Sequence, residues 1–274
     1  MPSTDKPTKT FERLITFVEQ AGQLAAEQQH TMDYWDRAYK ADQSVVTEAD
    51  RRVEDFLVER IARLDPTANI VTEEAERPFD PRKSPTFAVD PIDGTDVYSQ
   101  GMPGWCVSVG MLDADLSPVA GVIYAPRLDL VLAAQGKGFA SLNDTVLPLP
   151  ALPDPISPRS NLMVTSRIHR TLDLRGYVGK IRGIGSAALH LCYPLIYPAV
   201  IGALEGPGIH IWDMAAAHAI NRALGQNIRY LSGLAIDYAP LIHGSGAEDV
   251  VVAGQEATFR ELRRMLRRLP DRSA

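Results

Sequence analysis

The feature that most constrains this chain is the stretch TFAVDPIDGTDVYSQG, which runs from Thr86 to Gly101. It places Asp90 and Asp93 three residues apart, with a proline between them and a glycine directly after them. Proline, aspartate and glycine are all common in turns, so a simple turn is one interpretation. The other is that a cation lies between the two carboxylates, because an uncompensated pair at short range drives one of them towards protonation.

Composition narrows the class of protein. The chain has 274 residues, of which 45% are hydrophobic and 23% charged, enough for one large domain or two moderate ones. Its net charge of -6 argues against nucleic acid or an anionic membrane as the main partner. An acidic protein that binds a phosphorylated molecule needs a local source of positive charge, and a metal ion is one such source.

Signals for targeting or disulfide formation are weak. The N-terminal stretch MPSTDKPTKTFERL has no apolar segment of the signal-peptide kind. The most apolar long stretch, from Tyr193 to Leu204, is too short to span a bilayer and carries two prolines. Cys106 and Cys192 lie far apart in apolar surroundings, which favours core thiols over a disulfide. We therefore expect a cytoplasmic protein without a membrane segment.

Hydrophobic periodicity predicts helices and strands in two domains. Segments 11–29 and 45–64 repeat apolar residues at helical spacing, and runs such as ANIV, TFAV and WCVSVGML are typical of strands. Prolines cluster from residue 148, so we predict an N-terminal α+β domain (1–147) with most metal ligands and a C-terminal α/β domain (148–274). In the second domain we expect GIGSAALHLCYPLI to be a turn and a helix, IHIWD a strand, and MAAAHAINRALG a helix.

Acidic residues recur where predicted strands end or helices begin, which is where α/β folds assemble their sites. Each has an ordinary explanation, for example a helix cap at Asp213 or a capping pair between Thr47 and Asp50. Taken together they predict a site for a hard divalent cation such as Mg²⁺, which prefers oxygen ligands. The sequence has no CxxC pair or close histidine cluster, so zinc or iron is not expected.

The segments VTEADRRVE, TEE, DPIDGT and IHIWDMAAA, in this order, resemble the inositol monophosphatase family. This is a superfamily of Mg²⁺-dependent, lithium-sensitive phosphomonoesterases, and the similarity extends from about Phe11 to Gly225. The resemblance implies a layered αβαβα fold, a small phosphorylated metabolite as partner, and a homodimer. It also implies two or three Mg²⁺ ions, as in two-metal hydrolysis of phosphate esters.

The resemblance also assigns the ligands of these ions. Glu73, Asp90 and the backbone carbonyl of Ile92 would hold the first Mg²⁺, with Asp90 bridging to a second ion that Asp93 and Asp213 also bind. A third, weaker ion would lie near Glu73. On this interpretation Asp90 and Asp93 are close together because they share ions.

Catalysis and phosphate binding follow from the same resemblance. Asp50 and the hydroxyl of Thr95, together with Glu73, would orient and activate the attacking water. Backbone N–H groups of Gly94 and Thr95 would hold the phosphate at the start of a helix. Lys40 lies where the family carries a mobile catalytic loop, although a solvated lysine explains it equally well.

Substrate contacts are the least constrained part of the prediction. The resemblance nominates Gly185, Ser186, Ala187 and Glu205. The segment VTSRIH adds Arg167 and His169 as candidates for binding a second anionic group, and a loop pair without a function is the alternative for these two residues. The first candidate substrate is inositol monophosphate or a related sugar phosphate. The alternatives are a 3'(2'),5'-bisphosphate nucleotide, histidinol phosphate, and, more remotely, a non-catalytic role in binding a phosphorylated ligand.

Overall fold

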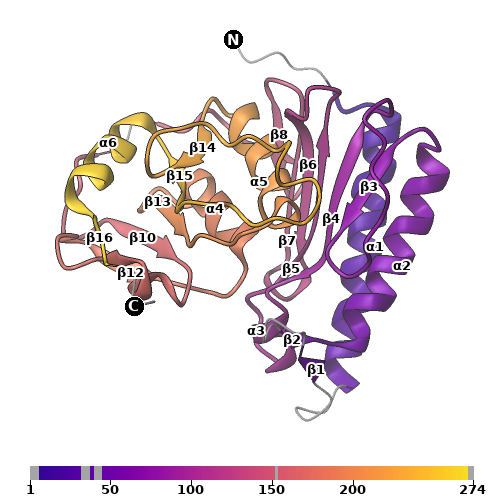
Figure 1. The fold of residues 1–274 in the computed structure, drawn as a ribbon, viewed down its shortest axis with the longest axis horizontal. Helices are drawn as coiled ribbons and strands as arrows, with labels where there is room; N and C mark the ends of the chain where they lie inside the picture. Colours follow the sequence, from indigo (N-terminus) through magenta and orange to yellow (C-terminus); the bar gives the residue numbers. More distant parts are fainter. Residues whose placement is uncertain (1–5, 32–37, 40–44, 152–153, 271–274) are drawn as a thin grey trace.

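Two larger β-sheets alternate with three layers of helices (Figure 1). One pair of helices covers the outside of the first sheet, a second pair separates the two sheets, and a single helix covers the far side of the second sheet. The computed structural model describes residues 6–31, 38–39, 45–151 and 154–270. In order, the layers are helices α1 and α2, a seven-stranded sheet, helices α4 and α5, a five-stranded sheet, and helix α6. This is the layered αβαβα fold that the family resemblance implies.

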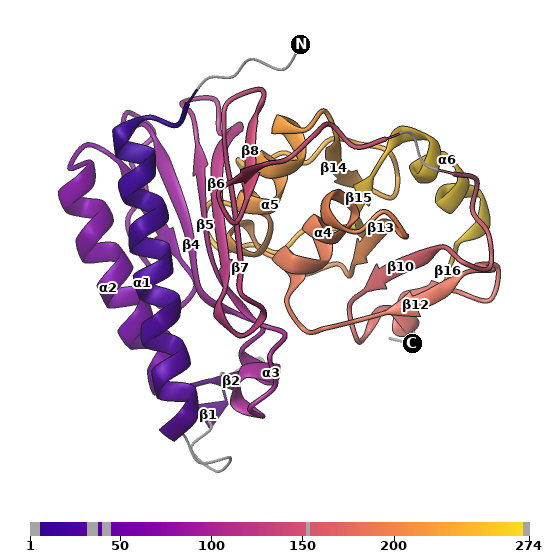
Figure 2. The same cartoon turned by 180° about the vertical axis from the view of Figure 1, so that it is seen from behind.

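Helices α1 (Lys9–Thr31) and α2 (Glu48–Leu64) cover the outer face of the first sheet, as Figure 2 shows from behind. Each presents an apolar stripe at helical spacing, including Leu14 and Val18 in α1 and Val53 and Leu57 in α2. These side chains pack with one face of the sheet in a single buried cluster. The sequence periodicity therefore placed both helices correctly.

The first sheet has the strand order β3-β4-β5-β6-β7-β8-β9. Strand β3 is parallel to β4, and each later neighbour is antiparallel. The strands are β3 (Asn69–Thr72), β4 (Thr86–Asp93), β5 (Cys106–Leu112), β6 (Pro118–Ala125), β7 (Leu130–Gln135), β8 (Phe139–Leu142) and β9 (Thr145–Val146).

The second sheet has the order β12-β10-β13-β15-β14, with β10, β12 and β13 parallel and the other two strands antiparallel to their neighbours. Its strands are β10 (Asn161–Val164), β12 (Lys180–Arg182), β13 (Val200–Glu205), β14 (Asn227–Tyr230) and β15 (Val251–Gly254). Helices α4 (Ala187–Ile196) and α5 (Ile211–Ala223) fill the space between the sheets, and α6 (Glu256–Met265) covers the far face.

The remaining elements are short. They are β1 (Ala38–Tyr39), β2 (Val45–Val46), α3 (Thr95–Ser99), η1 (Pro126–Leu128), η2 (Ile168–Arg170), β11 (Leu172–Asp173) and β16 (Arg267–Arg268). In the described part of the chain, no helix combines the length and apolar character needed to cross a membrane. Both cysteines are buried and free, as the sequence predicts.

The predicted strand IHIWD is wrong. Helix α5 begins at Ile211, so Trp212 and Asp213 lie in its first turn. The local reason is a cap, because the Asp213 carboxylate accepts a hydrogen bond of 2.6 Å from the backbone N–H of His210. The strand that precedes this helix is β13, which ends eight residues before Asp213, at Glu205.

Helix α5 approaches the first sheet closely because two glycines leave room for it. Gly110 of β5 and Gly121 of β6 are directly opposite each other in the antiparallel pair. A Cβ atom on Gly110 would lie 2.6 Å from the Cβ of Ala215, and one on Gly121 would lie 2.4 Å from the carbonyl oxygen of Ala216. The helix therefore rests on bare strand backbone, two residues after Asp213.

We expect Gly121→Ala to destabilise the protein by roughly 1–3 kcal/mol, because the added methyl must push α5 off the sheet. Urea denaturation followed by circular dichroism measures the change. Gly206→Ala is the matched control, since its Cβ would meet nothing closer than 3.6 Å. Equal stability of Gly121→Ala and the control would contradict the close packing.

Candidate metal centre and substrate pocket

A β-bulge puts Asp90 and Asp93 on the same face of the first sheet. Side chains alternate along a regular strand, so residues three apart face opposite sides. Here Asp90 is opposite Ser108 and Asp93 is opposite Cys106, so two residues of β4 match one residue of β5. The extra residue returns the second aspartate to the face of the first. This is the side that packs against α4 and α5, and it answers why the two acids are spaced as they are.

Helix α5 brings a third carboxylate to this face. Within the described residues, Asp90, Asp93 and Asp213 each offer one oxygen, and these oxygens lie within 4.8 Å of one another. The three acids come from a strand and from a helix more than a hundred residues later in the chain. The structure therefore brings together three of the ligands that the sequence analysis nominated.

Asp90 lies at the centre of an unfavourable charge distribution. It is 1% exposed, and neither of its carboxylate oxygens meets a hydrogen-bond donor. Burial raises the pKa of Asp90 well above its ordinary value, and the charges of Glu73, Asp93 and Asp213 raise it further. A buried carboxylate in this setting is stable only if it is protonated or if a cation neutralises it.

Asp93 is held by the start of helix α4. Its carboxylate accepts hydrogen bonds from the Ser186 hydroxyl at 2.5 Å and from the backbone N–H groups of Ala188 at 2.6 Å and Ala187 at 3.1 Å. Burial nevertheless raises the pKa of Asp93 to about 7, and the charge of Asp213 contributes. Of the predicted substrate contacts, Ser186 thus has its hydroxyl directed at a candidate metal ligand, and the neighbouring Gly185 forms the turn with a φ of 122°.

Asp50 and Thr95 meet beside the carboxylate cluster. Asp50 accepts hydrogen bonds from the N–H and the hydroxyl of Thr47, so the predicted capping pair is present. Its other oxygen lies 3.0 Å from the Thr95 hydroxyl, which is also 2.9 Å from the carbonyl oxygen of Ile92. Burial raises the pKa of Asp50 to about 6. Gly94 precedes Thr95 with a φ of 95°, a conformation that favours glycine.

Glu73 directly follows strand β3. It lies close enough to Asp90 for the charge of Glu73 to raise the pKa of Asp90. A second buried acid near Glu73 was not predicted from the sequence. Glu54 of helix α2 is 2% exposed and accepts a hydrogen bond of 2.8 Å from the backbone N–H of Glu74. The sequence did offer a sign that Glu54 is buried, because it lies one helical turn after Asp50 and next to the apolar positions Val53 and Leu57.

A pocket of about 330 Å³ adjoins the cluster, with Asp213 in its wall. Of the predicted substrate contacts, Ala187 and Glu205 line it, and so do two arginines, Arg167 and Arg170. The other lining residues are Thr165, Thr171, Gly206, Pro207 and Ile209. A molecule that reaches the carboxylates from this side therefore meets one buried acid and two cations.

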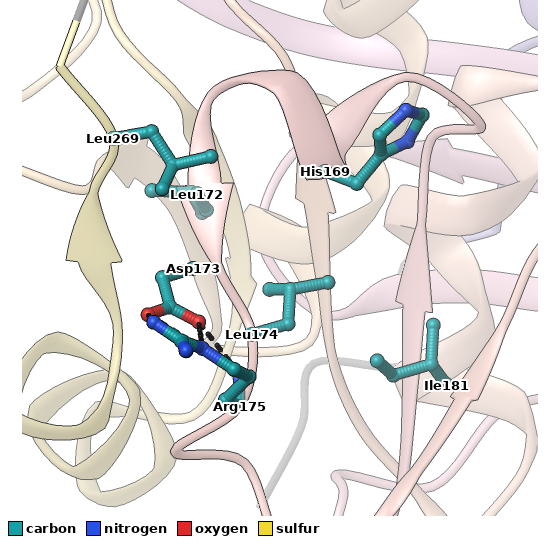
Figure 3. Close-up of a pocket in the computed structure, with 7 residues that line it drawn as sticks. All are labelled: His169, Leu172, Asp173, Leu174, Arg175, Ile181 and Leu269. Carbon is teal, nitrogen blue, oxygen red and sulfur yellow. Dashed lines mark hydrogen bonds and ion pairs between the residues drawn. The ribbon is translucent and has the colours of Figure 1, made fainter.

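His169 lies elsewhere. It lines a separate pocket of about 480 Å³ with Leu172, Leu174, Ile181 and Leu269 (Figure 3). The charged pair in this second pocket, Asp173 and Arg175, is already joined by hydrogen bonds of 2.6–3.1 Å. Lys40, the candidate loop residue, falls outside the described residues.

The donor atoms fit a hard divalent cation. The three acids of the cluster offer carboxylate oxygens, and Asp90 in particular has two buried oxygens that meet no donor. Mg²⁺ and Ca²⁺ are bound by such oxygens, whereas thiolate and imidazole ligands of a softer site are not part of the cluster. A bound cation would replace the mutual repulsion of the carboxylates by attraction.

Comparison with known proteins shows which family this chain resembles in sequence. The sequence profile of the inositol monophosphatase family matches residues 8–266. Inositol-1-monophosphatase of Synechocystis sp. is 31% identical over 252 residues, covering 82% of each chain. The 3'(2'),5'-bisphosphate nucleotidase CysQ of Escherichia coli K12 is 29% identical over 212 residues, covering 73% of this chain and 82% of CysQ.

Solved structures share the fold. The extragenic suppressor protein suhB of Bartonella henselae superposes with a TM-score of 0.79 at 24% identity, covering 94% of this chain and 98% of suhB. The IMPase of Thermotoga maritima gives a TM-score of 0.78 at 21% identity, covering 94% of this chain and 96% of that protein.

We expect Asp90→Asn to stabilise the metal-free protein at pH 7.5 by roughly 1–3 kcal/mol, the cost of a buried polar group that has no hydrogen-bond partner. The raised pKa of Asp90 and Asp93 means that the fold is favoured below the ordinary carboxyl pKa and loses this stability as pH rises through about 7. An amide at position 90 removes one charge and can donate to the neighbouring acids. Denaturation at pH 5 and pH 7.5 in EDTA measures the difference.

The same substitution should weaken Mg²⁺ binding by roughly 10–100-fold or more, measured by isothermal titration calorimetry. Asp173→Asn is the control, because that acid lies in the pocket of Figure 3 and pairs with Arg175. If Asp90→Asn bound Mg²⁺ as tightly as the control does, Asp90 would not be a ligand.

Proposed function

The chain belongs to the inositol monophosphatase family and is a phosphoric monoester hydrolase, and we propose that it hydrolyses inositol monophosphate or a related sugar phosphate with Mg²⁺ as cofactor. The observation that carries this proposal is the cluster of Asp90, Asp93 and Asp213 beside a pocket with a buried acid in its wall. The first feature suits a cation that binds phosphate, and the second suits the hydroxyl groups of a polyol.

The cation would be held by the carboxylates of Glu73, Asp90, Asp93 and Asp213 together with the carbonyl of Ile92. Bound Mg²⁺ would polarise the phosphate and favour deprotonation of water at neutral pH. The remaining contributions come from the protein itself.

Asp50 and Thr95 would handle the proton of the attacking water. The Thr95 hydroxyl has one proton and two acceptors within 3.0 Å, Asp50 and the Ile92 carbonyl, so it can donate to one of them and still accept from water. Asp50 has its pKa raised to about 6, which makes it a stronger base than an ordinary carboxylate. Thr95 would thus pass a proton from the attacking water to the buried carboxylate of Asp50.

The phosphate would be held by the backbone N–H groups of Gly94 and Thr95, where α3 begins. Gly94 adopts a φ of 95°, and a Cβ there would lie 3.3 Å from the Gly104 carbonyl oxygen. A side chain at this position would strain the backbone and make a tight contact with the Gly104 carbonyl oxygen. On the other side of the cluster, Glu205 and Ala187 would contact the alcohol part of the ester, with the Glu205 carboxylate accepting its hydroxyl groups.

A bisphosphate nucleotide is the second candidate substrate, and one observation favours it. Arg167 and Arg170 line the same pocket as Asp213, and two cations can bind a second phosphate on one substrate. The similarity to the 3'(2'),5'-bisphosphate nucleotidase CysQ supports the same candidate. Homodimer formation, lithium sensitivity and a cytoplasmic location stay predictions from the family resemblance.

A phosphate-release assay tests both candidates. We expect hydrolysis of inositol 1-phosphate in the presence of Mg²⁺ and its loss in EDTA, and we expect Arg167→Ala to change KM for this substrate less than twofold. If adenosine 3',5'-bisphosphate is the preferred substrate instead, Arg167→Ala should raise its KM by roughly tenfold or more. Absence of Mg²⁺-dependent turnover on either ester, on histidinol phosphate and on fructose 1,6-bisphosphate would contradict the proposed function.

We expect Asp50→Asn to lower kcat/KM by roughly 10²–10⁴-fold while Mg²⁺ binding is retained. In the wild type, kcat/KM should rise with pH through about 6, because Asp50 must lose its proton before it can act as a base. The variant should lack this rise. A pH–rate profile with the same acidic limb in both proteins would assign the limb to another group.

A further inference from the structure

One buried histidine connects the wall of the pocket to the turn that holds Asp93. His190 of helix α4 is 1% exposed. Its Nδ1 lies 2.6 Å from a carboxylate oxygen of Glu205, at the end of β13, and its Nε2 accepts a hydrogen bond of 2.9 Å from the backbone N–H of Ile184. Both ring nitrogens are therefore engaged by groups from different segments.

These partners determine the tautomer of His190. A backbone N–H can only donate, so Nε2 must carry a lone pair towards Ile184. The single proton of the neutral ring is then on Nδ1, where it is donated to Glu205. The imidazole acts as a neutral, directional donor to a carboxylate that is 4% exposed.

Glu205 depends on this donor for its orientation. Burial raises the pKa of Glu205, and the hydrogen bonds from His190 and from the Thr165 side chain oppose that rise. Thr165 also lines the pocket, so donors on two sides restrict the carboxylate within the pocket wall. Without the His190 donor, a buried acid would lose a charge-assisted hydrogen bond and would be free to rotate or take up a proton.

The other end of the imidazole reaches the metal-binding side of the site. Ile184 precedes Gly185 and Ser186, and Ser186 donates its hydroxyl to Asp93. The Ser186 N–H in turn bonds to the Gly104 carbonyl. His190 thus spans from the acid in the pocket wall to the turn that orients Asp93.

We propose that His190 is a positioning residue that orients Glu205 for recognition of the hydroxyl-bearing alcohol part of the substrate. The inference rests on the proposed function, because it assigns Glu205 to that alcohol. It predicts that the donor on the Nδ1 side governs KM for a polyol phosphate. The acceptor on the Nε2 side holds the turn and has a smaller part in binding the alcohol.

Two substitutions separate the two sides of the ring. His190→Asn places an amide near the position of Nδ1 and can still donate to Glu205. His190→Gln places an amide near Nε2 and can still accept from Ile184, but leaves Glu205 without its donor. We expect His190→Gln to raise KM for inositol 1-phosphate at least tenfold with kcat changed less than threefold, and His190→Asn to stay within threefold of wild type in KM.

Phenyl phosphate, whose leaving group has no further hydroxyl, is the comparison substrate, and its KM should change less than twofold in both variants. Glu205→Gln should raise the KM for inositol 1-phosphate like His190→Gln, with no additional loss in the double variant. His30→Gln, at the exposed end of α1, controls for histidine replacement in general. Equal KM increases for both substrates, or an unchanged KM for inositol 1-phosphate in His190→Gln, would overturn the proposal.

Nuclear magnetic resonance tests the arrangement without turnover. Long-range ¹H–¹⁵N spectra of the wild type should show a protonated Nδ1 and an unprotonated Nε2 on His190, and Glu205→Gln should shift the Nδ1 proton. The opposite tautomer would overturn the proposal even if a variant failed to fold. If the wild type showed this tautomer but hydrolysed no polyol phosphate, the proposed function would fail while the positioning contact stood.

Discussion

The main constraint on this structure is the repulsion between carboxylates that lie close together in a buried place. Asp90 is enclosed, its oxygens meet no donor, and three further acids surround it. A protein without a ligand at this place would be more stable with a neutral residue at position 90, because an unpaired buried charge is strongly unfavourable. The unfavourable energy is explained if the site is built to bind a cation, which converts the same charges into ligands. The arrangement is thus evidence for binding in its own right.

Several features of the fold converge on that site. A β-bulge in β4 turns Asp93 to the face of Asp90. The facing glycines Gly110 and Gly121 let helix α5 lie against the sheet, which brings Asp213 within reach. The first residues of helix α4, Ala187 and Ala188, donate their backbone N–H groups to the Asp93 carboxylate. The first sheet and both helices of the middle layer therefore contribute to the carboxylate cluster, and the cluster forms only when they are packed together.

The sequence predicted the acids but only part of their surroundings. The spacing of DPIDGT and the family resemblance identified Asp90 and Asp93, since short motifs at strand ends are local features. The glycine pair, Glu54 and His190 were missed because their roles depend on partners far away in the chain. His190 in particular reads as an ordinary helix residue until the structure places Glu205 and Ile184 beside its two nitrogens. The strand predicted for IHIWD failed for a related reason, because a cap at His210 outweighed its β-branched and aromatic character.

The cation site can be tested directly by anomalous diffraction from crystals of the protein soaked in Mn²⁺, which takes the same oxygen ligands as Mg²⁺. We expect an anomalous peak between the carboxylates of Asp90, Asp93 and Asp213, with oxygens of all three directed at it. Crystals without any such peak, in which the three side chains point away from one another, would contradict this expectation.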